Sequence, residues 1–247
     1  MSSGASLVCL LPARNAAGDL PGYLRSAARF CDAIVALDDG STDDTRALLQ
    51  ASPLVKVLLT NPRREGYRGW KDGENRNRLL RAAAELKPEW ILWIDADERM
   101  DAGDAAALRE FVRRDALPGC VYGFEHYWMW GRRRYDPRCS WIFRLFDYEP
   151  GQTLPRRRLH FNPVPTGIPP RAWIRTTIRV QHLGVATEER RLGRLAKYRE
   201  ADPRGRYGTD LSALSRRPPG DLPVWRRRPP GLPVLIVPED RPAQARR

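Results

Sequence analysis

The segment from Trp90 to Met100 constrains the fold more than any other part of the chain, because its polarity reverses within one residue. Its first five residues, Trp90 to Ile94, are all apolar, which is typical of a strand buried on both faces. Asp95 and Asp97 follow, and side chains two residues apart on an extended backbone project to the same side. Paired carboxylates at the end of a buried strand suit Mg²⁺ or Mn²⁺, which take oxygen ligands and are commonly shared with substrate phosphates. The segment therefore indicates a metal site at the carboxyl end of a buried strand.

The same acids also have a simpler interpretation, which this segment alone does not exclude. Glu98 and Asp101 stand where capping residues would precede a helix over residues 104–114, so the cluster could be an acidic turn that binds nothing. The choice between a metal site and a structural turn depends on what the rest of the chain brings to the same place.

Apolar runs alternate with amphipathic stretches through the first hundred residues. Strands are expected over residues 6–11, where Pro12 ends the run, and over 33–37 and 55–59, ahead of the strand at 90–94. Helices are expected over 19–31, around 47–49 and over 74–86. Strands and helices that alternate with short connections predict an α/β fold, a mostly parallel sheet with helices on both faces.

Polar residues follow three of these strands directly. In open parallel sheets, ligands bind beyond the carboxyl ends of the strands, so the three groups are expected to meet along one rim. They are Arg14 with Asn15, Asp38 with Asp39, and Asp95 with Asp97. Such convergence is what a binding cleft requires.

The second half of the chain is richer in aromatic and β-prone residues. Strands are expected over 119–130, 138–148 and 172–183, followed by a charged helix over 187–201. We therefore expect a single domain over 1–202, with an α/β half over 1–101 and a smaller β-rich half over 102–202.

The segment 203–247 differs in composition from everything before it. It holds nine of the 22 prolines and ten arginines against four acids, so it is expected to bury little and to be largely disordered. A short stretch at 234–237 is apolar enough to dock locally.

Charge and cysteine content narrow the classes of partner and location. The chain has 247 residues and a net charge of +13, which favours anionic partners: nucleic acid, phosphorylated ligands or an acidic membrane face. The four cysteines are far apart and form no C-x-x-C pair, so a zinc site is not expected. The chain has no long apolar run and no segment typical of a secretory leader. We expect a reducing, cytoplasmic location, with peripheral contact to an anionic membrane as an option.

Four segments, taken in order, resemble the family 2 glycosyltransferases of GT-A (Rossmann-like) fold. They are Leu11 to Asn15, Val35 to Thr45, Gly69 to Ala83 and the D-x-D motif at Asp95 to Glu98. The third segment is similar to the branch related to bacterial lipopolysaccharide and cell-surface glycan transferases. The resemblance covers roughly residues 6–101, and it implies that 1–101 form the nucleotide-sugar-binding half of the domain and 102–202 the acceptor half.

This resemblance implies transfer of a sugar from a nucleotide-diphosphate sugar donor, with a divalent metal (Mn²⁺ or Mg²⁺) at the D-x-D motif. The acceptor would be a glycan, a lipid-linked sugar or a small molecule. By similarity, Pro12, Ala13 and Arg14 would line the base pocket and Asp39 would accept a hydrogen bond from the base. Arg76 would approach the base or the diphosphate. Asp95 would lie near the ribose or the metal, and Asp97 would be the main metal ligand.

A further metal ligand and a catalytic base are expected from the second half. His182 resembles a late histidine that joins the metal in some GT-A enzymes, and a neutral imidazole suits Mn²⁺. An inverting enzyme also needs a group to take the acceptor's proton. The candidates for that base are Glu125, Asp136, His126 and His160. The branch often has a His-Glu pair where this chain has His160 followed by Phe161, which leaves the base open.

Three other functions remain as alternatives. A nucleotidyltransferase would use similar acids, but residues 10–19 contain no Gly-rich phosphate loop with a lysine. A nucleic-acid-binding protein would explain the basic charge and the run Arg226 to Arg228, but no known module motif accompanies them, so nucleic acid is not the expected partner. A degenerate transferase would bind nucleotide without turnover.

Overall fold

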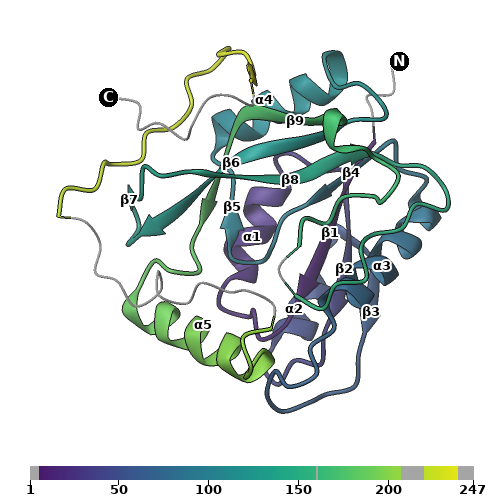
Figure 1. The fold of residues 1–247 in the computed structure, drawn as a ribbon, viewed down its shortest axis with the longest axis vertical. Helices are drawn as coiled ribbons and strands as arrows, with labels where there is room; N and C mark the ends of the chain where they lie inside the picture. Colours follow the sequence, from purple (N-terminus) through teal and green to yellow (C-terminus); the bar gives the residue numbers. More distant parts are fainter. Residues whose placement is uncertain (1–5, 160, 207–219, 239–247) are drawn as a thin grey trace.

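The computed structural model describes residues 6–159, 161–206 and 220–238, which form a curled, mixed sheet with helices packed on it (Figure 1). The first half of the chain alternates strands and helices as the apolar pattern predicts. Its elements are β1 (Leu7–Ala13), α1 (Leu20–Ala27), β2 (Ala33–Asp38), α2 (Thr45–Ala51), β3 (Val55–Thr60), α3 (Asp72–Ala83), the 3-10 turn η1 (Ala84–Leu86) and β4 (Trp90–Trp93).

The second half is dominated by long strands. Its elements are β5 (Glu98–Arg99), α4 (Ala102–Arg114), β6 (Val121–Trp130), β7 (Arg134–Tyr135), β8 (Ser140–Asp147), the 3-10 turn η2 (Pro170–Ala172), β9 (Trp173–His182), α5 (Glu188–Ala201) and β10 (Ile236–Val237). The strands expected over 119–130, 138–148 and 172–183 are thus confirmed to within a few residues.

The sheet runs in the order β10-β9-β6-β8-β4-β1-β2-β3. Strands β4, β1, β2 and β3 are parallel neighbours, and β8 joins the two halves by pairing antiparallel with both β4 and β6. Because β1, β2 and β4 are parallel and adjacent, their carboxyl ends lie at one edge. The three polar groups that follow these strands therefore do share a rim.

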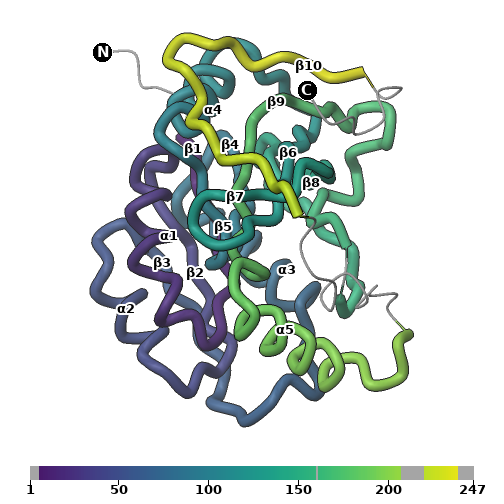
Figure 2. The backbone as a smooth tube through the Cα atoms, turned by 90° about the vertical axis from the view of Figure 1, so that its left-hand side faces the viewer, coloured from purple at the N-terminus to yellow at the C-terminus, as the bar shows by residue number. Residues whose placement is uncertain are grey.

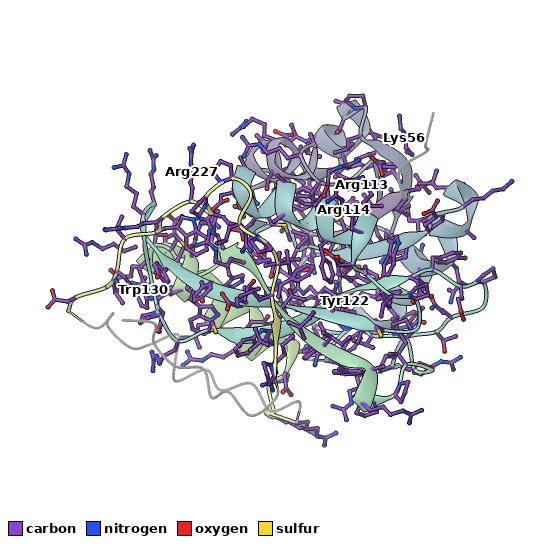
Figure 3. The ribbon with its side chains drawn as sticks, turned by 90° about the horizontal axis from the view of Figure 1, so that it is seen from above. Lys56, Arg113, Arg114, Tyr122, Trp130 and Arg227 are labelled. Carbon is purple, nitrogen blue, oxygen red and sulfur yellow. The ribbon has the colours of Figure 1, made fainter. Side chains whose placement is uncertain are left out.

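Alternate side chains of β1 enter two separate apolar layers. Leu7, Cys9 and Leu11 pack on one face, with residues of α1, α2 and α4. Val8 and Leu10 pack on the other face, against α3. A strand buried on both faces has no polar side to display, which explains the continuous apolar run in its sequence. Tyr122 of β6 is buried in this body, whereas Lys56, labelled at the edge of the view in Figure 3, is exposed.

One strand boundary differs from the expectation. β1 does not end at Pro12 but continues to Ala13, with Pro12 opposite Leu37 of β2. The pairing of β1 with β4 ends at Leu10, so beyond that level β1 has a strand on one side only. Proline lacks an N–H and is tolerated where a strand has a free side.

Residues 220–238 of the Pro/Arg-rich segment run along the outer edge of the sheet beside β9, and β10 lies within the stretch 234–237 that is expected to dock (Figures 1 and 2). Residues 207–219 and 239–247 of that segment lie outside the described residues. The guanidinium of Arg228 is buried and donates to the carbonyls of Thr177, Leu232 and Pro233 at 2.8, 3.2 and 2.5 Å. It also lies 3.4 Å from Asp104 of α4. Beyond it, β10 pairs antiparallel with β9. One arginine with many acceptors fixes a segment whose apolar content alone would not.

This docking depends on a close approach between α4 and the segment 220–238. A Cβ added at Gly103 of α4 would lie 2.2 Å from the carbonyl oxygen of Arg228. Replacing Gly by Ala inside a helix normally stabilises by roughly 0.5–1 kcal/mol. For Gly103→Ala we expect instead a loss of about 1–3 kcal/mol, because the backbone of Arg228 must move. The measurement is urea unfolding followed by tryptophan fluorescence.

Gly193→Ala is the matched control, because Gly193 lies within α5 and nothing is within 4 Å of its added Cβ. That variant should gain stability by up to about 1 kcal/mol. An equal gain in both variants would contradict the proposed contact.

Candidate functional site

The D-x-D motif lies in a turn and not on an extended strand. β4 ends at Trp93, and the N–H of Glu98 donates to the carbonyl of Asp95 at 2.9 Å. The side chain of Glu98 closes the turn by accepting from the N–H of Asp95 at 2.8 Å. The expectation that Asp95 and Asp97 project to one side of an extended strand is therefore wrong, and the two carboxylates contact different partners.

Asp95 is held by two arginines. Its Oδ1 accepts from Arg76 of α3 at 3.1 Å, and its Oδ2 lies 3.3 Å from Arg144 of β8. Burial raises the pKa of Asp95, but these two guanidinium groups outweigh it and hold the pKa well below its ordinary value. Arg76 also binds Asp72 one helical turn earlier, at 3.0 Å. Asp95 is thus an ionised carboxylate with both oxygens engaged.

Asp97 contacts an imidazole and a third arginine. Its Oδ2 lies 3.3 Å from Nε2 of His182 and 3.2 Å from Nη1 of Arg194 on α5. Burial raises the pKa of Asp97, and His182 and Arg194 together bring it well below its ordinary value. The backbone is also close: a Cβ at Gly184 would lie 2.4 Å from the same oxygen. A side chain at this position would therefore displace the carboxylate of Asp97.

Glu98 has a structural role as the partner of buried side chains from other strands, which the sequence did not indicate. It is 1% exposed, it forms an ion pair with Arg144, and its Oε1 lies 3.1 Å from Nε2 of His126. Burial lowers the pKa of that histidine, and the neighbouring His182 lowers it further. Of the two residues expected to cap the next helix, only Asp101 does so, accepting from the N–H of Asp104 at 3.0 Å.

The acidic loop after β2 is joined to the same rim. Asp39 is buried, accepts from Asn61 at 2.6 Å and forms an ion pair with Arg64. Asn61 also donates to Asn75 of α3 at 3.1 Å, and Asn75 is the residue before Arg76. A chain of polar contacts therefore runs from the first acidic loop to the D-x-D turn.

Arg14 lies at the end of β1, where Pro12 is half-buried and Ala13 is buried. Its guanidinium donates to the carbonyl of Arg64 at 2.8 Å and stacks over Tyr67, with 4.3 Å to the ring centroid. Burial lowers the pKa of Arg14, and the nearby Arg64 adds to this effect. The three predicted base-pocket residues and Asp39 thus share one corner of the rim.

Helix α5 brings two cations to the rim, and sequence reasoning missed both. Arg194 contacts Asp97, and Lys197 follows three residues later on the same helical face. Nζ of Lys197 lies 4.3 Å from the ring centroid of Trp70. Burial, together with the charge of Arg194, lowers the pKa of Lys197 to about 8. The i, i+3 spacing of two cations on a charged helix was the available signal, but it is common on solvated helices.

Of the four candidate bases, Glu125 and Asp136 are not brought to the D-x-D turn, whereas His126 contacts it through Glu98. Glu125 accepts from the hydroxyl of Tyr127 at 2.9 Å, whereas His126, the next residue of β6, contacts Glu98. Neighbouring residues of a strand point to opposite faces, so Glu125 lies on the far face from the turn. Asp136 is paired with Arg138 at 2.6 Å. His160 lies outside the described residues.

A divalent cation requires several oxygen or nitrogen donors that converge on one point. Within residues 6–159, 161–206 and 220–238, no three His, Cys, Asp or Glu side chains converge as ligands. Asp97 and His182 form a pair, and Nδ1 of His182 is buried without a partner. One carboxylate and one imidazole suit Mn²⁺ when oxygen ligands from elsewhere complete its shell. The residues therefore fit a cation held by Asp97 and His182, while both oxygens of Asp95 are bound to arginines.

The parallel half-sheet, the acidic loop after β2 and the acidic turn after β4 together define the class as a GT-A α/β fold. The sequence model described as "Glycosyl transferase family 2" matches residues 9–179, well over half of the chain. The chain belongs to that family.

The relatives and solved structures that the chain matches are similar to it over only part of their length. Uncharacterized proteins of Mycobacterium tuberculosis and Mycobacterium bovis are each 32% identical over 93 residues, covering 37% of this chain and 23% of their own length. The crystal structure of TarS from S. aureus superposes with a TM-score of 0.51 at 11% identity, over 85% of this chain and 41% of that chain. Glucosyl-3-phosphoglycerate synthase from Mycobacterium tuberculosis has a TM-score of 0.36 at 22% identity, over 51% of this chain and 44% of its own. The chain thus spans less than half of these proteins.

The contacts of Glu98 give a direct test of its structural part. Glu98→Ala would leave Arg144 with a single carboxylate, Asp95 at 3.3 Å, in a buried place. Breaking a buried ion pair from one side costs about 3–5 kcal/mol, so we expect a loss of stability of that size in urea unfolding.

Glu110→Ala is the control, because Glu110 is exposed and pairs only with exposed arginines of α4. It should leave the unfolding midpoint unchanged. Equal midpoints for the two variants would show that Glu98 does not hold the turn.

Proposed function

We propose that the chain is a metal-dependent glycosyltransferase that moves a sugar from a nucleotide-diphosphate sugar to a glycan, lipid-linked or small-molecule acceptor. Membership of glycosyl transferase family 2 supports sugar transfer. The observation that carries the proposal is the meeting of Asp39, Arg76 and the Asp95–Asp97 turn at one rim, with cations of α5 across from them.

The proposal gives each group of residues at the rim its own role. Arg14, beside Pro12 and Ala13, lies at the base-binding corner with Asp39, whose ordered oxygens would accept hydrogen bonds from a base. Arg76 and Arg144 hold Asp95 ionised near the ribose. Asp97 and His182 would hold the cation, which when bound would offset the charge that grows on the departing diphosphate.

Arg194 has a second use in this arrangement. In the structure its guanidinium contacts the same oxygen of Asp97 that faces His182. A divalent cation at Asp97 would take over the neutralisation of that carboxylate. Arg194 would then be free to meet the diphosphate, and Lys197, three residues later, would meet it from the same helix.

The contacts that Glu125 and Asp136 make do not support either residue as the base that takes the proton from the acceptor. Both carboxylates are engaged away from the turn, with Tyr127 and Arg138 respectively.

Among the described residues, no helix has the length and apolarity to cross a bilayer. We further propose that the net charge of +13 favours peripheral contact with an anionic membrane, where a lipid-linked acceptor would be met.

A thermal-shift screen of UDP, GDP, CDP and dTDP, with and without Mn²⁺, tests the donor site. One nucleotide with Mn²⁺ should raise the melting temperature by roughly 5–10 °C at about a hundredfold excess over its Kd. The shift should be lost in Asp97→Asn and kept in Asp115→Asn, because Asp115 is exposed at the end of α4.

An undiminished shift in Asp97→Asn would remove the metal assignment. Stabilisation by oligonucleotides alone would favour the nucleic-acid alternative. Binding of a nucleotide sugar without release of nucleoside diphosphate would favour a degenerate transferase.

The pKa of Lys197 predicts a pH dependence of nucleotide binding. Lys197 is charged below its pKa of about 8 and neutral above it, so its contact with a diphosphate is lost as the pH rises through 8. We expect the Kd of the nucleotide to be about tenfold higher at pH 9.5 than at pH 7. The measurement is isothermal titration calorimetry across this pH range.

Lys197→Arg should flatten the dependence, because arginine stays charged throughout the range. Lys56→Arg, an exposed site on β3, should keep it. A wild-type Kd that does not change with pH would show that Lys197 makes no contact with the nucleotide.

A further inference from the structure

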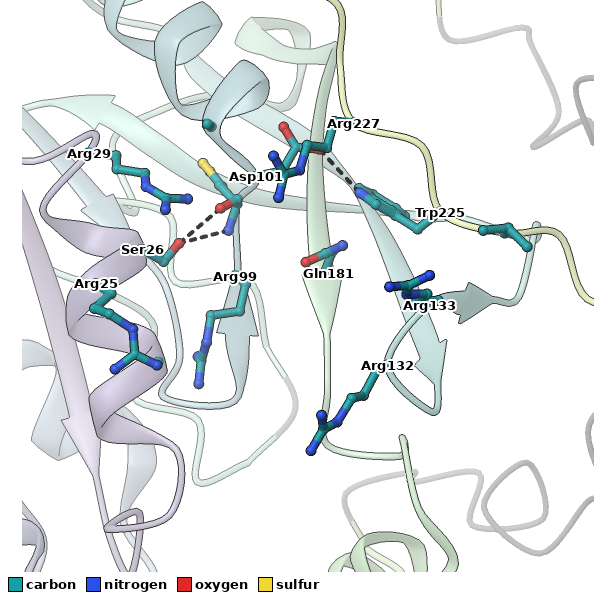
Figure 4. Close-up of a pocket in the computed structure, with 14 residues that line it drawn as sticks. Arg25, Ser26, Arg29, Arg99, Asp101, Arg132, Arg133, Gln181, Trp225 and Arg227 are labelled. Carbon is teal, nitrogen blue, oxygen red and sulfur yellow. Dashed lines mark hydrogen bonds between the residues drawn. The ribbon is translucent and has the colours of Figure 1, made fainter.

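A cavity of about 610 Å³, away from the D-x-D turn, is lined by arginines from four separate segments (Figure 4). Helix α1, strand β5, the turn between β6 and β7, and the segment 220–238 each contribute at least one. These arginines are Arg25, Arg29, Arg99, Arg132, Arg133 and Arg227. The volume lies within the range of small-molecule sites in proteins, roughly 300–1,000 Å³.

The cavity is separate from the D-x-D rim. Its lining includes Arg99 of β5 and Gln181 of β9, which are paired with each other. Their strand neighbours Glu98 and His182, also paired with each other, have side chains in the D-x-D cluster. Because neighbouring residues of a strand point to opposite faces, the β5–β9 pair separates the two sites.

Within the described parts of the chain, five of the six guanidinium groups form no ion pair. The sixth, that of Arg99, lies 3.7 Å from the carboxylate of Asp19 and donates to the carbonyls of Ala96, Glu98 and Asp19 at 2.7, 2.6 and 2.6 Å. The carboxylate in the lining is that of Asp101, and it is already engaged. Its Oδ2 accepts from Trp225 at 3.1 Å and lies 3.3 Å from Arg179. The positive charge of the cavity is therefore not balanced by its own walls.

The segment 220–238 completes one wall and stiffens it. The N–H of Trp225 donates to the carbonyl of Arg133 at 2.6 Å, which ties this segment to the β6–β7 turn. The indole packs edge-on against Tyr127 and Tyr135, with centroids 5.7 and 5.4 Å away, and Arg179 stacks on it at 4.6 Å. A fixed aromatic wall beside several guanidinium groups offers both apolar contact and charge.

We propose that this cavity binds a phosphate-bearing ligand, at a site distinct from the donor site. Like charges repel, so gathering unpaired arginines around one hollow is unfavourable until an anion enters it. Guanidinium groups bind phosphate oxygens in pairs of parallel hydrogen bonds, which makes phosphate the anion that suits them. The phosphate can come from a soluble metabolite or from a lipid headgroup. The proposal does not depend on the transferase reaction.

The first arm of the test uses inorganic pyrophosphate, titrated calorimetrically into the full 247-residue chain in EDTA. EDTA removes divalent cations that would recruit the probe to Asp97. The Arg29→Gln/Arg227→Gln variant changes two exposed arginines of the cavity lining, one from α1 and one from the segment 220–238, so folding should be retained. We expect saturable binding in the wild type and about tenfold weaker binding in this variant.

The matched control is Arg46→Gln/Arg81→Gln, which loses the same net charge from exposed sites on α2 and α3. It should bind within about twofold of the wild type, because screened charges far from the cavity contribute little.

The second arm measures sedimentation with phosphatidylcholine vesicles that contain phosphatidic acid. Loss of pyrophosphate binding in the cavity variant alone supports the site with a soluble phosphate as its source. Loss of vesicle binding in that variant alone supports it with a lipid headgroup. If neither probe separates the cavity variant from its control, the proposal is overturned. The Mn²⁺-dependent nucleotide shift is measured separately, so failure of one site is distinguishable from failure of the other.

Discussion

The guanidinium of Arg144 joins the two halves of this molecule at their most charged point. It forms ion pairs with Asp95 and Glu98, which lie at the two ends of a four-residue turn, and it belongs to the strand that links the parallel half to the β-rich half. Without that cation, a buried glutamate and a neighbouring aspartate would repel each other in a poorly solvated place. The shape of the D-x-D turn therefore depends on a residue almost fifty positions later in the chain.

The same pairing principle distinguishes the two aspartates of the motif. Asp95 is enclosed by arginines that belong to α3 and β8, elements packed within the core. Asp97 faces His182 at the end of β9 and Arg194 on the more exposed helix α5. A carboxylate that is held rigidly by buried arginines is suited to positioning other groups. A carboxylate whose arginine partner lies on a surface helix can exchange that partner for a metal ion. In the proposed function, Asp97 would therefore be the principal metal ligand and Asp95 its oriented neighbour.

The short pairing of β5 with β9 places two differently charged environments back to back. On one face lie the carboxylates and histidines of the D-x-D cluster, and on the other lies an arginine-lined cavity closed by the segment 220–238. Alternation of side chains along two short strands is sufficient to separate them. Part of the surplus of basic residues is therefore gathered at one place, since arginines from α1, β5, the turn between β6 and β7 and the segment 220–238 line this cavity. A transferase with phosphate chemistry on both faces of one ribbon would have a physical use for its high net charge.

The sequence by itself determined the alternation of strands and helices, because buried parallel strands need unbroken apolar runs and their helices need an apolar stripe. It also determined that Arg14, Asp39 and the D-x-D acids share a rim, since all three follow adjacent parallel strands. Local patterns do not carry contacts between residues distant in the chain. Only the tertiary structure decided that Glu98 is buried against Arg144 and His126, that Glu125 lies on the far face of β6, and that Arg194 and Lys197 reach the rim. It also decided that Arg228 fixes a proline-rich segment to the sheet, because that arginine finds its acceptors only when β9 and α4 are already in place.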